Sequence, residues 1–207
     1  LRYNLIKSNK CIIIPGSGVN TDKFKYTKIA PFPIKFLMIS RLTNEKGVLE
    51  FYKAAKIVYK IYPEVKFQLI GSKERSIDRI SDANIELIEN NNFINYLKFS
   101  SDIYGLISSC HVFVLPSYHE GMPMSVLEAL SVGRAIITTN ADGCRDTVID
   151  NINGFCISVK NVDELVSKMI WFIKNTDKIE KMGLESRKIV TKKFDKITIN
   201  NLYMELV

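Results

Sequence analysis

Residues 111–139 read HVFVLPSYHEGMPMSVLEALSVGRAIITT, and this stretch decides the fold class of the chain. Its two apolar runs, 111–116 and 135–139, predict strands, and the segment between them predicts a helix that begins near Pro123 and ends at Gly133. Neither run alternates apolar with polar residues, which is typical of strands buried on both faces of a parallel sheet. A strand, a helix and a second buried strand therefore indicate one unit of an α/β fold.

The same alternation continues in both directions along the chain. Further strands are predicted at 11–14, 34–40, 65–71 and 93–97, a polar helix-like stretch precedes the short apolar run 85–88, a turn is predicted at 151–155, and helices are predicted at 47–61, 101–109, 161–174, 177–190 and 195–206. We therefore predict an α/β domain with a doubly wound, Rossmann-like parallel sheet. Ligands of such sheets bind at the carboxyl ends of the strands.

The composition is that of an ordinary globular protein. The chain has 207 residues, 46% hydrophobic and 25% charged, which suits one domain or one domain with an appendage. No apolar run approaches the roughly 18 residues of a membrane span, no signal peptide is recognisable, and the initial Leu suggests a fragment. Cys11, Cys110, Cys144 and Cys156 are scattered, which indicates a reduced, cytoplasmic protein without disulfides or zinc.

The net charge of +7 could attract an anionic partner. Most of the 29 basic residues are lysines, however, and they are spread along the whole chain. This pattern favours a solvated basic surface over a nucleic-acid footprint, so no nucleic-acid partner is expected.

The helix near Pro123 begins without a good cap. Gly121 and Met122 offer no side-chain oxygen to the first-turn N–H groups, where Ser, Thr, Asp or Asn would be preferred. These N–H groups and the helix dipole could bind a phosphate instead. The simpler alternative is that water or Ser125 satisfies them.

Glu128 lies farther along the same helix, roughly 7.5 Å from Pro123 at 1.5 Å per residue. We expect it to share an exposed face with Met124, Ser125 and Ser131. From there its carboxylate could accept two hydrogen bonds from a vicinal diol such as a ribose. The simpler interpretation is a surface acid that the helix dipole favours.

Two cations follow the strand predicted at 34–40. Arg41 comes directly after the strand, and Lys46 lies five residues on, just before Gly47. Facing a crevice that also holds helix-tip N–H groups, Arg41 as a bidentate fork and Lys46 as a point charge would make a pyrophosphate site. Taken alone, both could be solvated loop cations.

Other ligand motifs are incomplete or absent. The segment IIIPGSGVN at 12–20 opens like a dinucleotide fingerprint, but Thr21 stands where the third glycine is required, so NAD binding is not expected. The sequence has no phosphate-loop motif and no nucleophile elbow. His111 and His119 lack metal-ligand spacing; His111 is assigned a structural role, whereas His119, beside Glu120, could reach the crevice.

Five motifs follow one another in a recognisable order over nearly the whole chain. They are IPGSGVNTDKF, SRLTNEKGVLEF, FQLIGS, VFVLPSYHEGMPMSVLEALSVGRAIITT and GCRDTVIDNINGF. Together they resemble the nucleotide-binding half of retaining family 4 glycosyltransferases, and the pair Glu120 and Glu128 is the most specific part. The resemblance implies the C-terminal half of a two-domain GT-B enzyme, with a linker and first strand at 1–30, the nucleotide-sugar-binding domain at 31–190, and a C-terminal helix at 191–207 that packs back toward an N-terminal domain.

The resemblance also implies roles for the crevice residues. Arg41 and Lys46 would hold the diphosphate and stabilise the departing nucleotide. Glu128 would bind the ribose hydroxyls, while Glu120 would face the transferred sugar and its developing positive charge. Backbone groups of one short segment would meet the phosphates and sugar: Gly121, Met122, Pro123, Met124 and Ser125.

The implied reaction is transfer of a sugar, with retention, from a UDP-linked donor to a glycan or lipid-linked acceptor in polysaccharide or glycan biosynthesis. The acceptor would be held by an N-terminal domain, and the full enzyme could associate peripherally with the inner face of the membrane. No metal or other cofactor is expected. DGCRDTV is similar to the subset that transfers N-acetylhexosamine or related sugars to lipid-linked oligosaccharides.

Three positions depart from the family pattern. Ser40 stands where Gly often precedes the arginine, the linker reads PGSGVN rather than Pro-Asn-Gly-Val-Asp, and Lys98 lies where a Gly is usual near the base. The last departure leaves the identity of the base open. A nucleotide-sugar epimerase of the same architecture and a non-catalytic nucleotide-binding domain remain alternatives.

Overall fold

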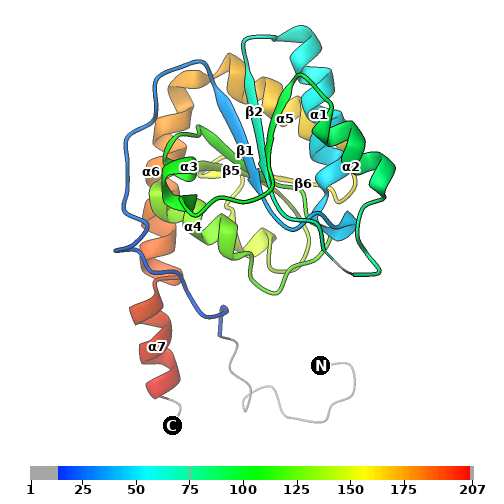
Figure 1. The fold of residues 1–207 in the computed structure, drawn as a ribbon. Coiled ribbons are helices and arrows are strands. Elements are labelled where there is room, and N and C mark those ends of the chain that lie inside the picture. The colour runs from blue at the N-terminus through cyan, green and yellow to red at the C-terminus, as the bar shows by residue number, and fades with distance from the viewer. Residues whose placement is uncertain (1–13, 75, 206–207) are drawn as a thin grey trace.

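The computed structural model describes residues 14–74 and 76–205 (Figure 1). The strands are β1 (Lys35–Ile39), β2 (Lys66–Ile70), β3 (Ile94–Leu97), β4 (Val112–Leu115), β5 (Ala135–Thr139) and β6 (Gly154–Ile157). The helices are α1 (Val48–Ile61), α2 (Asp82–Glu89), α3 (Ile103–Ser108), α4 (Met124–Val132), α5 (Val162–Lys174), α6 (Thr176–Lys193) and α7 (Lys196–Met204), with 3-10 turns η2 (Asn44–Lys46) and η3 (Arg145–Thr147). Within these described residues no helix is both long and apolar enough to cross a bilayer.

The six strands form one sheet in the order β3-β2-β1-β4-β5-β6, and every neighbouring pair is parallel. The chain moves outward in one direction from β1 to β3, returns to β4, and then moves outward in the other direction. The doubly wound parallel sheet is therefore confirmed. Its topological switch point lies between β1 and β4, where ligands of such folds bind.

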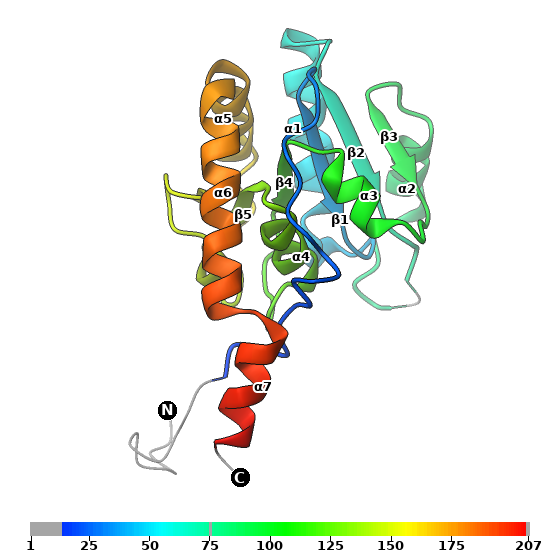
Figure 2. The ribbon, with the colours of Figure 1, turned by 90° about the vertical axis from the view of Figure 1, so that its left-hand side faces the viewer.

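Helices cover both faces of the sheet (Figures 1 and 2). On one face α1 packs against α5, and on the other face α4 packs against α3 and α6. The apolar strands form the core between them. Phe36 of β1 stacks on Phe67 of β2 at 5.5 Å between ring centroids, and Phe51 of α1 meets Phe67 edge-on at 6.3 Å.

Most predicted elements are present, with four differences. The run at 85–88 belongs to helix α2 rather than to a separate element, and α4 begins at Met124, with Pro123 as its cap. The turn at 151–155 leads directly into β6, which the sequence did not predict because Gly usually weakens a strand. A Cβ at Gly154 would lie 2.0 Å from the carbonyl oxygen of Ile136, so only Gly permits this pairing. The strand predicted at 11–14 lies outside the described residues except for Ile14, which is not in a strand.

Two arginines, one after α4 and one on α6, hold the segment that precedes β1 against these helices. Arg134, which is fully buried, donates to the carbonyl oxygen of Thr27 at 3.0 Å. Arg187 of α6 donates to the carbonyl oxygens of Phe24 at 3.0 Å and Ser131 at 2.8 Å. The segment is thereby fixed against the C-terminal end of α4.

The segment around Val19 pairs with the chain just before α7. Val19 forms an isolated parallel bridge with Asp195, and the N–H of Val19 donates to the carbonyl oxygen of Phe194 at 2.8 Å. The N–H of Lys196 donates back to the carbonyl oxygen of Val19 at 2.9 Å. Figure 1 shows α7 projecting from this junction, away from the sheet.

His111 is buried at the start of β4, as the structural interpretation of this residue requires. Its Nδ1 accepts a hydrogen bond from the N–H of Lys35 at 3.1 Å, and the ring of Phe32 lies 4.8 Å from the imidazole. Burial, together with the charges of Arg134 and Lys35, lowers the pKa of His111 to about 4, against an ordinary value of 6.5. The imidazole is therefore neutral near pH 7.

We predict that His111 makes the protein less stable as the pH falls. The unfolded chain binds this proton near pH 6.5 and the folded protein only near pH 4, so stability decreases as the pH falls through that interval. Between pH 7 and pH 5 this group should remove about 2 kcal/mol of unfolding free energy. Urea unfolding of the wild type and of His111→Asn would measure the difference, with exposed His119→Asn as the control. Equal pH dependence in wild type and His111→Asn would contradict the prediction.

Candidate active site

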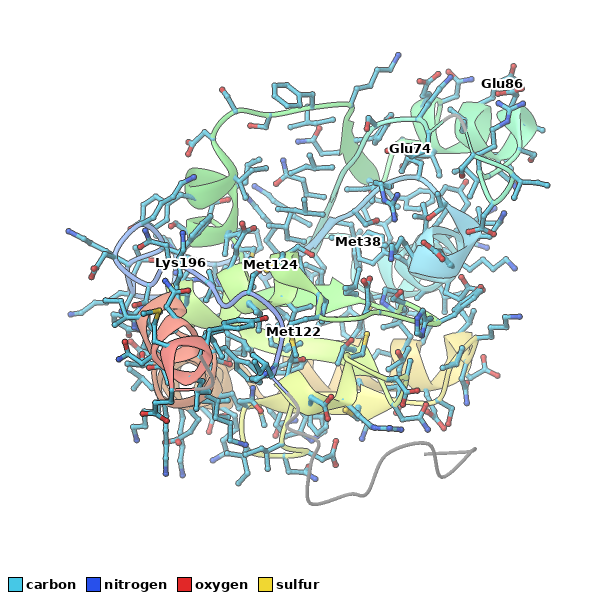
Figure 3. The ribbon with its side chains drawn as sticks, turned by 90° about the horizontal axis from the view of Figure 1, so that it is seen from below. Met38, Glu74, Glu86, Met122, Met124 and Lys196 are labelled. Atoms are coloured by element: carbon cyan, nitrogen blue, oxygen red, sulfur yellow. The ribbon has the colours of Figure 1, made fainter. Side chains whose placement is uncertain are left out.

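The candidate site lies at the switch point, where β1 and β4 end side by side. A cavity of about 330 Å³ opens there. It is lined by the strand-end residues Ile39, Ser40 and Leu115 and by seven residues predicted from the sequence, Arg41, Lys46, Glu120, Met122, Pro123, Met124 and Ser125. Figure 3 looks onto this end of the molecule and shows Met122 and Met124 near the middle of the view. The structure therefore brings most of the predicted residues together.

Gly47 allows the turn that contains Lys46 to pack closely against the segment after β4. Its φ of 72° is a left-handed conformation, and a Cβ there would lie 2.1 Å from the carbonyl oxygen of Pro116. The close approach lets the N–H of Tyr118 donate to the carbonyl oxygen of Glu45 at 2.7 Å, while the Ser117 hydroxyl donates to the same oxygen at 3.0 Å. The turn after β1 and the loop after β4 are thus joined as one unit.

Lys46 and Glu120 form an ion pair inside the crevice, with 3.0 Å between Nζ and Oε1. Both side chains are largely buried, at 11% and 15% exposure, so the pair is screened less by water than a surface pair. Lys46 also lies 3.3 Å from Oε1 of Glu45, and Arg41 lies 3.5 Å from the same oxygen. The sequence did not single out Glu45, because an acid between two loop cations is typical of solvated loops.

The N-terminus of α4 borders the cavity, as predicted. Pro123 is its cap residue, and no side chain caps this end of the helix. Because Pro123, Met124 and Ser125 line the cavity, the positive end of the helix dipole is directed at whatever occupies it. Arg41, Lys46 and this helix end together make a site for an anion.

Glu128 does not line this cavity, although it was predicted as a binding residue. It is half-buried, and burial raises its pKa to about 6, with the charge of Lys23 partly opposing the shift. The exposed face expected for Glu128 and Ser131 is wrong: Ser131 is fully buried and its hydroxyl donates to the carbonyl oxygen of Phe24 at 2.6 Å. The segment before β1 covers that side of α4.

Gly121 is exposed and lines a neighbouring cavity of about 620 Å³. Met122 borders both cavities, so the two are adjacent. His119, the other candidate for the crevice, is exposed and lines neither of them.

The loop after β5 supports the backbone of Glu120, a role that the sequence did not indicate. The N–H of Glu120 donates to the carbonyl oxygen of Asp142 at 3.3 Å. Gly143 has a φ of 74°, and a Cβ there would lie 2.4 Å from the carbonyl oxygen of Glu120. Cys144 is buried behind this contact, and burial raises the pKa of its thiol. In the sequence this loop follows a predicted strand and opens the motif DGCRDTV, but neither signal assigns Asp142 or Gly143 a contact with Glu120.

The described residues contain no group of three or more His, Cys, Asp or Glu side chains arranged to hold a metal ion. The positive charge of the crevice comes from side chains and the helix end. The two cations and the helix end can bind an anion next to the largely buried carboxylate of Glu120.

Comparisons with known proteins agree on one family. The model of the family described as "Glycosyl transferases group 1" matches residues 19–189. A relative from Campylobacter jejuni, N,N'-diacetylbacillosaminyl-diphospho-undecaprenol alpha-1,3-N-acetylgalactosaminyltransferase, is 32% identical over 97% of this chain and 55% of its own length. The chain spans about half the length of the curated relatives it matches.

Solved structures share the fold. The C-terminal domain of the group 1 glycosyl transferase LpcC from Francisella tularensis matches with a TM-score of 0.76 at 23% identity, over 86% of this chain and 99% of that chain. Anabaena Alr3699/HepE in complex with UDP matches with a TM-score of 0.79 at 21% identity, over 91% of this chain and 55% of that chain. The domain is therefore of the type found as the C-terminal half of GT-B glycosyltransferases.

We predict that Gly47→Ala destabilises the protein by about 2–4 kcal/mol, because the new Cβ meets a backbone carbonyl and the residue keeps a positive φ. Gly121→Ala is the matched control, since a Cβ there has no atom within 4 Å. Thermal and urea unfolding of the two variants would measure the difference. Equal stability of the two would show that the approach to Pro116 is not a constraint.

Proposed function

The chain belongs to the glycosyl transferases group 1 family, and we propose that it binds a UDP-sugar and transfers the sugar to a glycan or lipid-linked acceptor with retention at the anomeric carbon. The observation that carries the proposal is the single cavity bordered by Arg41, Lys46, Glu120 and the uncapped end of α4. Two cations and a helix N-terminus suit a diphosphate. A buried carboxylate beside them suits the sugar from which the diphosphate departs.

Each part of the donor has a partner in this proposal. Arg41 and Lys46 contact the diphosphate, and the first N–H groups of α4 bind its oxygens. Glu128, which does not line the cavity but lies on the same helix, accepts hydrogen bonds from the ribose hydroxyls. Anabaena Alr3699/HepE, whose fold this chain shares, has been solved with UDP, which supports uridine as the base.

In the proposed reaction the bond between the anomeric carbon and the diphosphate oxygen breaks, an acceptor hydroxyl oxygen bonds to the same carbon on the same face, and the hydroxyl proton passes to an oxygen of the departing diphosphate. The leaving diphosphate gains negative charge, which Lys46 and Arg41 stabilise. The sugar gains positive charge, which the Glu120 carboxylate stabilises. Because Lys46 and Glu120 lie 3.0 Å apart, the cation for the leaving group and the carboxylate for the sugar are held next to each other by the fold.

We propose that no resident metal ion takes part. The charge on a departing diphosphate must be balanced by cations, and Arg41 and Lys46 supply two at the crevice. This expectation rests on the two side chains and is tested below with a chelator.

The acceptor is proposed from a relative. The Campylobacter jejuni protein is named for transfer of N-acetylgalactosamine to a sugar on diphospho-undecaprenol. We propose an acceptor of the same chemical class, a lipid-linked glycan at the inner face of a membrane, and an N-acetylhexosamine donor. Because this chain spans 55% of that relative, a second domain is proposed to hold the acceptor. α7, whose Ile197 and Met204 side chains are exposed, is proposed to pack against it.

We predict that the protein binds UDP in the presence of EDTA and that Lys46→Gln weakens this binding by about 1.5–3 kcal/mol, the usual contribution of a hydrogen bond to a charged group. Lys56→Gln, which removes the same charge from an exposed position on α1, should leave the affinity unchanged. Isothermal titration calorimetry would measure both. UDP binding that appears only with Mg²⁺ or Mn²⁺ would refute the metal-free site, and no UDP binding under any condition would refute the proposed function.

For the full-length enzyme we predict that Glu120→Gln lowers kcat by about 10²–10³ and raises the donor KM only slightly. An electrostatic contact that strengthens in the transition state appears in kcat rather than in KM. Steady-state kinetics with varied UDP-sugar would measure both constants, and UDP affinity serves as the control for an intact site. A raised KM with unchanged kcat would make Glu120 a binding residue and exclude the catalytic role.

A further inference from the structure

The carboxylate of Glu45 occupies a position that the proposed reaction does not explain. Its Oε1 lies 3.5 Å from the guanidinium of Arg41 and 3.3 Å from Nζ of Lys46. These are the two cations proposed to hold the diphosphate. In the described structure one carboxylate oxygen therefore contacts both cations of the site.

The position of this carboxylate is built into the fold. The backbone N–H of Glu45 donates to Oδ2 of Asp78 at 2.9 Å. Its carbonyl oxygen accepts from the N–H of Tyr118 at 2.7 Å and from the hydroxyl of Ser117 at 3.0 Å. Because three hydrogen bonds, one to Asp78 and two to the segment after β4, fix its backbone, Glu45 cannot move away from the site as part of a loose loop. Only its side chain can turn.

The charged side chains of the site balance one another. Arg41 and Lys46 carry two positive charges, and Glu45 and Glu120 carry two negative charges. A diphosphate that enters must therefore compete with carboxylates for the cations, because carboxylate and phosphate match the guanidinium fork in the same way.

Exposure distinguishes the two acids. The side chain of Glu120 is 15% exposed, whereas that of Glu45 is 39% exposed. A carboxylate that can turn into water loses little by leaving an ion pair, while a buried one loses much more. Glu45 is therefore the acid that can give way, and Glu120 the one that stays with Lys46.

We propose that Glu45 is an internal competitor of the nucleotide diphosphate: its carboxylate holds Arg41 and Lys46 when the site is empty, turns outward when the donor binds, and returns as the nucleotide leaves. The inference rests on the proposed function of the site. Its effect is largest for the product, since free UDP carries more negative charge than the sugar-linked donor and interacts more strongly with the two cations. Glu45 thus weakens the hold of the enzyme on UDP and speeds its release.

The test compares two variants with the same change in net charge. Glu45→Gln removes the competing charge but keeps the size of the side chain and the backbone hydrogen bonds. Glu86→Gln on α2 is the matched control, because Glu86 is exposed and Figure 3 shows it at the edge of the molecule, far from Met122 and Met124. Calorimetry with UDP, and stopped-flow displacement of a fluorescent UDP analogue, measure affinity and dissociation rate.

We expect Glu45→Gln to bind UDP about two- to fivefold more tightly than wild type, mostly through slower dissociation, because a half-exposed ion pair is worth little, and we expect Glu86→Gln to bind as wild type does. Unchanged or weaker binding by Glu45→Gln would overturn the inference and would make Glu45 a residue that merely holds the cations in place. If Glu45→Gln does not fold, Glu45→Asp, whose carboxylate is one methylene shorter and so competes less well for the two cations, should also bind UDP more tightly, and equal binding overturns the inference. A wild-type protein that binds no UDP would instead refute the proposed function itself.

Discussion

The approach of Gly47 to the carbonyl oxygen of Pro116 is the contact on which the site depends. It allows the turn after β1 to meet the loop after β4 without an intervening side chain. The backbone bond between Tyr118 and Glu45 and the ion pair between Lys46 and Glu120 both span these two segments. A parallel sheet brings the strand ends to one edge, but the distance between the loops that follow them is decided by this one glycine.

The site combines strong local charges with little net charge. Lys46 lies between two carboxylates, and the open end of α4 adds a partial positive charge without adding a side chain. Such an arrangement limits the cost of burying these charges, because each largely buried charge has a partner.

The fold was predictable from the sequence because its strands are continuous apolar runs and the apolar residues of its helices recur at intervals of three and four. The crevice was predictable for the same reason: Arg41 and Pro123 follow strands whose ends must share an edge. What the sequence could not show was set by tertiary contacts. Ser131 looks like an exposed helical residue until Arg187 and the segment before β1 cover it, and Gly143 shows its role only where its backbone passes Glu120. The strand β6 was missed because a glycine was needed for close packing at its first residue.

The bridge between Val19 and Asp195 has a mechanical consequence. The chain enters the α/β body and leaves it at neighbouring points, so the body is attached to the rest of the chain through a single pivot rather than from opposite sides. A rotation about that pivot would carry β1, α4 and the loops between them as one piece. Gly16 and Ser17, on the far side of that pivot, lie against Met122 and Met124 at the crevice, so such a rotation would also change the contacts that these two methionines make.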